Sequence, residues 1–402
     1  MHVHLILAIA ISLPAVSQTP SGETLTESAF LAGFDENHVA VRAFTEDLAR
    51  AEAARRRAGT LANPRLEFER ESPEDNPTQT TWTAAWAPPL DGRLRLAREA
   101  AEAGVGAARE RFAADRLRLR REARKAYADW ALSIERREAL QSQRALVDSL
   151  AEQVRRRAEV GEESGIGARR LLLASAEIGA ELAVAEAEAV RAAALPQAWR
   201  PDLPASARPA RPPLESPPST APPGTRPALE ALRFEVQQAE LEGRLARRFL
   251  IFPEVSAGWQ RLEHAGVEQT GAVFGVSWSL PLFDRSQAAR IEAAGRQRAL
   301  EARLAIATTR TRAELDASRA AYAILAARAR EQALAIIETD RLADGATASF
   351  RAGESTVTDL LETLRSVREA RLKEIELYAE ALEAQRALEA AGGLLPSTEE
   401  LR

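Results

Sequence analysis

Two long stretches without proline limit the fold of this chain more than any other feature. The first runs from residue 90 to residue 195, and the second from residue 282 to residue 395. Both are rich in Ala, Leu, Arg and Glu, which lose little conformational freedom in a helix. At about 1.5 Å per residue, a helix from Asp91 to Val160 would be on the order of 100 Å long. A compact domain has no such diameter, so the sequence predicts a coiled coil or a helical barrel.

Each proline-free stretch contains one cluster of turn-forming residues. Three glycines occur between residues 161 and 167, and Gly353 lies within Arg-Ala-Gly-Glu in the second stretch. Such clusters interrupt a helix and reverse the chain. We therefore predict two long antiparallel helical hairpins, at residues 91–195 and 284–391.

Segments in which apolar and polar residues alternate precede each helical hairpin. They lie near residues 64–71 and 80–88, and again near residues 254–263 and 271–281. A period of two residues is typical of a strand with one apolar face. The large residues expected on this face are Leu66, Phe68, Trp82, Trp86, Val255, Trp259, Phe274, Val276, Trp278 and Leu280.

The apolar face of these strands has two possible environments: the core of a small soluble sandwich, or lipid. The predicted helices are too long to pack on a small sandwich, which favours lipid. Open sheet edges cannot remain in hydrocarbon, and known membrane barrels need about eight strands, so four strands would have to close by oligomerisation. The expected fold is mainly α with a β membrane segment. A trimer would form a 12-stranded β-barrel continuous with an α-helical barrel.

The order of helix, strand pair and helical hairpin occurs twice along the chain. Pro64 corresponds to Pro253 and Tyr127 to Tyr322, at offsets of 189 and 195 residues. This spacing indicates a tandem duplication.

Composition divides the chain into five segments. Residues 196–227 hold 11 of the 21 prolines and are expected to form a non-helical linker. Residues 1–17 have the short apolar run and small terminal residues of an export signal. The expected organisation is a signal peptide at 1–17, a first repeat at 18–195, the linker at 196–227, a second repeat at 228–392 and a tail at 393–402.

No residue pattern in the chain points to catalysis. There is no cysteine, and the net charge of −5 comes from interspersed charges of both signs, which gives no basic block for nucleic acid. His38 and His264 are far apart in sequence, whereas a metal site needs convergent ligands. No later segment approaches the ~20 apolar residues of a membrane helix. We expect an exported protein that is not an enzyme, with no cofactor, metal site or transmembrane helix.

Five short motifs occur in a fixed order along the chain. They are Leu25-Thr26-Glu27-Ser28-Ala29, Asn63-Pro64-Arg65-Leu66, the segment from Gly275 to Asp284, Arg351-Ala352-Gly353-Glu354 and Asp359-Leu360-Leu361. Taken together, these motifs resemble the TolC-like outer-membrane channels of tripartite efflux systems. The proline-rich linker and Pro-Leu-Phe-Asp-Arg-Ser-Gln look most like the cobalt-zinc-cadmium efflux branch, although the lipidated cysteine of many members is missing.

The resemblance implies a homotrimer in the cell outer membrane with a long periplasmic extension. Its partners would be outer-membrane lipid, a periplasmic adaptor and an inner-membrane pump of the RND type. The chain would be a passive exit duct, and the branch suggests heavy-metal cations as cargo. The alternative is a periplasmic adaptor or structural coiled-coil protein, although adaptors usually carry a single helical hairpin.

The helical reversals are the expected docking sites for an adaptor, although any helical hairpin needs small residues there. The residues concerned are Gly161, Ser164, Gly165, Gly353, Glu354 and Ser355. Asp340 and Asp344 lie one turn apart before the second reversal. In a trimer they would form carboxylate rings that narrow a pore; the alternative is that they are solvated surface charges.

Overall fold

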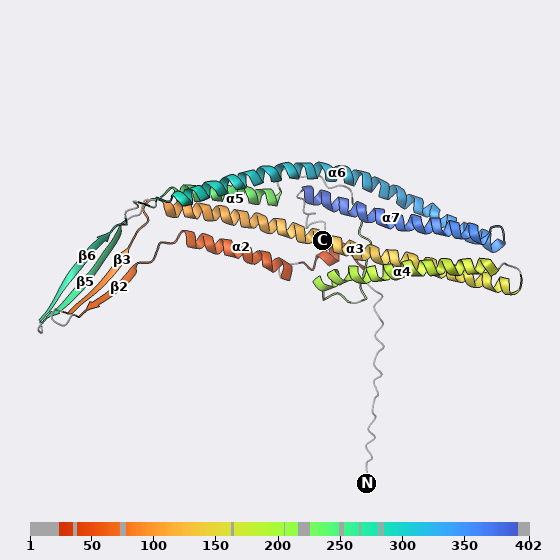
Figure 1. Ribbon diagram of the computed structural model, residues 1–402, viewed down its shortest axis with the longest axis horizontal. Coiled ribbons are helices and arrows are strands. Elements are labelled where there is room, and N and C mark those ends of the chain that lie inside the picture. The colour runs from red at the N-terminus through yellow and green to blue at the C-terminus, as the bar shows by residue number, and fades with distance from the viewer. Residues whose placement is uncertain are drawn as a thin grey trace, which may run out of the picture. The chain divides into compact units, whose positions relative to one another are not determined.

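The computed structural model consists of long helices and a small sheet (Figure 1). It describes residues 24–34, 38–72, 78–161, 165–204, 206–215, 226–248, 253–264, 267–279, 283 and 285–392. The predicted export signal, the tail 393–402, Ser164 and Leu280 lie outside these residues. The elements are β1 (Thr24–Leu25), α1 (Glu27–Leu31), α2 (Val39–Ala58), β2 (Arg65–Glu71), β3 (Thr78–Trp86), α3 (Arg93–Glu159), α4 (Gly165–Trp199), β4 (Arg208–Pro209), α5 (Pro227–Ala246), β5 (Glu254–His264), β6 (Val267–Ser277), α6 (Gln287–Ala352) and α7 (Val357–Gly392).

The chain forms two compact units, and the boundary between them falls inside α3. The first unit comprises Met1–Phe30 and Ala126–Pro213, and the second comprises Leu31–Lys125 and Leu214–Arg402. Each unit takes one part of α3. The units therefore do not follow the two sequence repeats.

Helix α4 extends further than the proline pattern predicts. We expected residues from Pro196 onward to be non-helical, but α4 includes Pro196 and ends at Trp199. Proline lacks a backbone donor and its ring crowds the carbonyl four residues earlier, but its own carbonyl can still accept. The amide of Arg200 donates to the carbonyl of Pro196 at 3.0 Å, which closes one more turn.

Strand β6 begins and ends four residues earlier than the expected segment 271–281. It pairs with β5 from His264 opposite Val267 to Glu254 opposite Ser277. Pro253 precedes Glu254 and cannot donate to a ladder, so pairing stops there. Trp278 therefore lies just beyond the strand rather than inside it.

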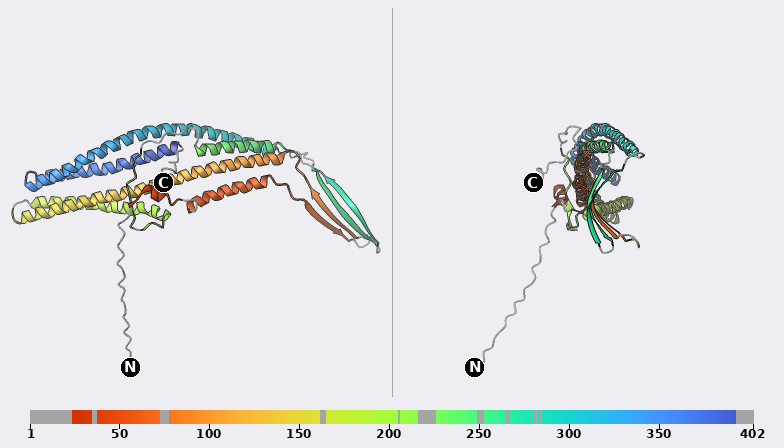
Figure 2. Two further views of the ribbon diagram at one scale, coloured as in Figure 1. Left: turned by 180° about the vertical axis from the view of Figure 1, so that it is seen from behind. Right: turned by 90° about the vertical axis from the view of Figure 1, so that its left-hand side faces the viewer.

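Strands β2, β3, β5 and β6 form one antiparallel sheet in the second unit, in the order β2-β3-β5-β6 (Figures 1 and 2). The pairing between β3 and β5 joins the two predicted hairpins, with Trp82 opposite Trp259. Residues that face each other across an antiparallel ladder lie on the same side of the sheet. The register therefore fixes which side chains share a face.

The helices of the second unit pack through small and aliphatic residues. Helix α6 lies beside α7, and α5 lies beside α6 (Figure 1). One core cluster includes Leu315 and Tyr322 from α6 with Leu388 from α7. A second places Leu96 and Ala100 of α3 against Leu241 of α5.

In the first unit, most of the buried side chains come from the second part of α3 and from α4. They include Leu150 and Val154 on α3, and Leu171 and Ile178 on α4. The ion pair between Arg136 and Glu188, at 3.6 Å, also joins the two helices. The small, regularly spaced apolar residues of both helices thus form their contact, as expected for paired long helices.

Two corresponding tyrosines bind backbone carbonyls within the predicted linker, a role that the sequence did not predict. In the first unit, Tyr127 is fully buried and its hydroxyl donates to the carbonyls of Leu25 at 2.5 Å and Ala210 at 2.8 Å. These acceptors adjoin the short parallel pair of β1 and β4. Burial raises the pKa of the Tyr127 hydroxyl, which keeps it a donor. In the second unit, the Tyr322 hydroxyl donates to the carbonyl of Glu215.

We predict that Gly258→Ala weakens the joint between β3 and β5. An added Cβ would lie 1.9 Å from the carbonyl oxygen of Trp82 and 2.9 Å from the Cα of Thr83, so backbone must shift. Overpacking of this kind costs about 1–3 kcal/mol. Thermal unfolding of the purified protein should show the loss. Gly271→Ala is the matched control on the same face, because a Cβ there meets nothing within 4 Å; equal loss in both variants would contradict the register.

Candidate membrane face and helical tips

The pairing register gathers the predicted apolar residues of the described strands on one face of the sheet. Leu66 is opposite Ala84, and Phe68 is opposite Trp82. Further across the sheet, Trp86 is opposite Val255. The next pairings are Val255 with Val276, Ala257 with Phe274 and Trp259 with Ala272. All these residues share one side of the pleat, which we call the apolar face.

The apolar face is more exposed than the polar face behind it, the reverse of a water-soluble sheet. Phe274 is 81% exposed, Val276 74% and Leu66 68%. On the polar face, Ser256 and Gly258 are only partly exposed and Ala85 is buried. Large contiguous apolar surfaces of this kind mark contacts with a membrane or another protein.

Aromatic residues lie midway along the strands and at the strand ends that lead to the helices. Phe68, Trp82 and Trp259 form the middle row, with ring centroids 4.5 Å apart for Phe68 and Trp82 and 6.2 Å apart for Trp82 and Trp259. Trp86 ends β3 and Trp278 follows β6, before α3 and α6, and Trp278 is about 20 Å from the middle row along the strand direction. Aromatic girdles border the ~25 Å apolar band of membrane β-barrels.

The polar face carries small side chains and carboxylates. Glu67 lies opposite Thr83, and Glu69 lies opposite Thr81. The same rows continue through Gly258 and Gln260 on β5. Because alternate residues of a strand point to opposite sides, these carboxylates are separated from the apolar face by the sheet itself.

The second reversal, between α6 and α7, is a tight turn closed by glycine. Gly353 has φ 80°, in the left-handed region, and its amide donates to the carbonyl of Phe350 at 3.1 Å. The amide of Glu354 reaches back to Ser349 at 3.0 Å, which gives the glycine C-cap that many helices use. Glu354 is exposed and Ser355 is half-buried.

Helix α7 then begins with a reciprocal cap. The hydroxyl oxygen of Thr356 accepts from the Asp359 amide at 3.2 Å, and the Asp359 carboxylate accepts from the Thr356 amide at 3.1 Å. This exchange is a capping box with aspartate in the acidic position. The hydrogen bond from the Thr356 hydroxyl, followed by that from its amide, lowers the pKa of Asp359. The turn is therefore held from both sides.

The first reversal, between α3 and α4, uses glycine in the same way. Gly161 also has φ 80°, and its amide donates to Ala158 at 3.2 Å. Gly165 is exposed at the start of α4, while Ser164 lies outside the described residues. A Cβ built on Gly161, Gly165 or Gly353 would meet nothing within 4 Å. Glycine is therefore not required at these positions by packing within the chain.

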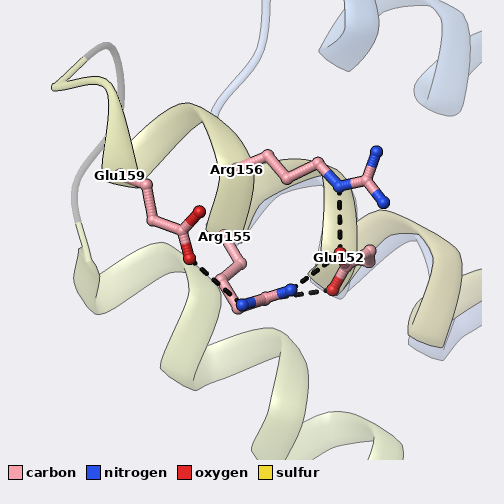
Figure 3. A network of polar contacts seen from close by, with 4 residues as sticks. All are labelled: Glu152, Arg155, Arg156 and Glu159. Carbon is pink, nitrogen blue, oxygen red and sulfur yellow. Dashed lines mark hydrogen bonds and ion pairs between the residues drawn. The ribbon is translucent and has the colours of Figure 1, made fainter.

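The last turns of α3 carry a network of four charged residues, shown in Figure 3. Arg155 binds Glu152 through two nitrogens, at 2.8 and 3.0 Å, and Glu159 through a third at 3.1 Å. Arg156 binds the same Glu152 at 2.9 Å. The hydrogen bonds from Arg155 and then Arg156 lower the pKa of Glu152 to about 2. Opposite charges three and four residues apart support this end of the helix.

The two predicted pore aspartates have different surroundings. Asp340 accepts a hydrogen bond from Arg371 of α7 at 2.5 Å, which compensates its charge and joins the two helices. Asp344 is exposed. The sequence did not reveal the partnership with Arg371, because the two residues are 31 positions apart.

Within the described part of the chain, His38 belongs to no cluster of metal ligands. The Nδ1 atom of His38 accepts the amide of Ala40 at 3.3 Å and caps α2, and His264 ends β5. No group of three or more His, Cys, Asp or Glu suited to a metal occurs in the ranges that the structure describes. Among the same residues, no helix is both long and apolar enough to cross a membrane.

Solved outer-membrane channels share this fold. CusC, from a study of folding and transmembrane channel formation, is 15% identical, with a TM-score of 0.76 over 96% of this chain and 100% of that chain. VceC from Vibrio cholerae is 17% identical, with a TM-score of 0.71, and the match covers 91% of this chain and 96% of VceC. CmeC from Campylobacter jejuni is 13% identical, with a TM-score of 0.70, and the match covers 97% of this chain and 94% of CmeC. No curated protein sequence is significantly similar to the chain.

A sequence match agrees with the likeness in fold. Residues 224–394, which contain the second repeat, match the family described as "Outer membrane efflux protein". The likeness in fold extends over the first repeat as well. The motif resemblance is thus confirmed. The second repeat is thus similar in sequence to outer membrane efflux proteins, and the chain as a whole shares the fold of solved outer-membrane channels.

Proposed function

We propose that this chain is one protomer of a trimeric outer-membrane exit duct in a tripartite efflux system. The observation that carries the proposal is the apolar face, on which Phe274 is 81% exposed beside other large apolar residues. Lipid is the environment in which such a face is stable. The polar face, with Glu67 and Glu69, would then line the lumen.

The free edges of the sheet support closure by several copies. Strands β2 and β6 are the outer strands, and the four strands alternate in direction. Strand β6 of one copy would therefore meet β2 of the next in an antiparallel pair. Backbone donors and acceptors at both edges would be satisfied, as hydrocarbon requires. Three copies would close a ring of twelve strands, within the range of known barrels.

The helical tips would dock on a periplasmic adaptor that links the duct to an inner-membrane pump of the RND type. The open space around Gly161 and Gly353 supports this role, because an adaptor helix could approach the backbone closely. The duct would be passive, and the pump would supply the energy.

Carboxylates on the sheet and near the second helical tip would influence which ions pass through the duct. Glu67 and Glu69 on the polar face would favour cations, as acidic rings do in channels. Asp344, which is exposed, is a better candidate for a pore constriction than Asp340, whose charge Arg371 compensates. Heavy-metal cations as cargo follow only from the resemblance to the cobalt-zinc-cadmium branch.

Fractionation of cells that express the full chain tests the proposal directly. The protein should be found in the outer-membrane fraction, need detergent for extraction and migrate as a trimer. A soluble periplasmic monomer would refute the proposed duct.

The two faces of β6 provide a matched pair of variants. Phe274→Arg should impair membrane assembly by roughly 2–4 kcal/mol, because a charge near the bilayer midplane is costly. Ser277→Arg should assemble and change only the conductance, because Ser277 lies on the polar face. The trimer yield in the outer-membrane fraction and single-channel conductance distinguish these results. Equal assembly of both variants would mean that the faces are assigned wrongly.

Substitution at the second tip tests docking. Gly353→Trp should abolish efflux while trimers persist, because the indole would block an approaching helix. Gly353→Asn is the matched control, since asparagine tolerates the left-handed backbone without large bulk. Resistance assays and adaptor co-purification provide the readout. Normal efflux with Gly353→Trp would rule out a docking role for this tip.

A further inference from the structure

Six arginines are among the residues that line a pocket of about 230 Å³ in the second unit. It lies among the first part of α3, the start of α5 and the end of α7. One carboxylate, Glu389, lines it together with alanine, leucine and proline. Its cationic residues are Arg118, Arg120, Arg121, Arg124, Arg226 and Arg386.

Ion pairs around the pocket hold several of its arginines in place. The floor consists of Arg124, Arg386 and Glu389, each less than a tenth exposed. Arg124 pairs with Glu389, which also accepts from Gln385 at 2.9 Å. Arg121, which also lines the pocket, forms an ion pair with Glu383 at 2.7 Å. Guanidinium groups fixed in this way lose little freedom when a ligand binds.

Arg226 and the start of α5 add further positive potential. The Arg226 guanidinium donates to the carbonyl of Ala391 at 2.6 Å and to Thr311 at 3.3 Å, and it lies 3.5 Å from Glu314. Burial lowers the pKa of Arg226, and this effect outweighs the opposing effect of Glu314. Helix α5 starts at Pro227 without a side-chain cap, and a helix start carries a partial positive charge.

We propose that this pocket is a binding site for a small oxyanion, a carboxylate or a phosphate. Planar guanidinium groups bind both in two-pronged geometry. The volume of about 230 Å³ accommodates such a ligand together with water. The bound anion bridges α3, α5 and α7. The inference stands independently of the proposed duct.

The test measures anion binding by the purified full chain in detergent. Inorganic phosphate and succinate are each titrated by calorimetry at constant ionic strength, in parallel with thermal unfolding. We expect saturable binding and a higher Tm with at least one anion, and the stronger of the two identifies the class. Arg120→Gln should weaken binding by about tenfold, the typical effect of one charge-assisted hydrogen bond. Arg116→Gln is the control, because Arg116 lies on the same helix outside the pocket, over the ring of Phe112.

Three results would overturn the proposal. The first is the absence of saturable binding of either anion to a folded protein. The second is equal weakening by Arg120→Gln and Arg116→Gln, which would indicate general attraction to a cationic surface. The third is binding only after removal of residues 393–402, which would mean that the chain's own tail fills the pocket. Circular dichroism confirms that each variant is folded.

Discussion

Hydrogen bonding along the four-stranded sheet is the constraint on which the rest of the structure depends. The ladder between β3 and β5 sets Trp82 opposite Trp259 and joins two hairpins that are far apart in sequence. A slip of one residue would move every side chain of a strand to the other face. The register thus keeps the apolar residues on one face and Glu67 and Glu69 on the other.

The same hydrogen bonds are incomplete at the outer strands, β2 and β6. In hydrocarbon, each unpaired donor or acceptor costs several kcal/mol. An isolated sheet is therefore unsuited to the environment that its exposed aromatic residues favour. A closed ring of copies meets both demands, which is why oligomerisation and lipid contact belong to one proposal.

Away from the sheet, polar groups hold the non-helical segments on the long helices. Tyr127 and Tyr322 have corresponding places in the two repeats, and each donates to a backbone carbonyl within the linker, that of Ala210 or Glu215. The amide of Glu215 also donates to Gln385, at 3.1 Å. Such buried polar contacts are costly when incomplete, so they specify where a proline-rich segment lies.

The sequence by itself determined the helices and strands, because the alternation of apolar and polar residues and the absence of proline are patterns among residues that are close together in the chain. It predicted the long helices, the strands and the chain reversal at Gly353, where the structure has the left-handed backbone that favours glycine. Only the tertiary structure decided the end of β6, since pairing with β5 stops at Glu254. It also decided the partner of Asp340 and the convergence of six arginines from α3, α7 and the residue before α5. These contacts join residues far apart in the chain, and no local pattern records which distant side chains meet.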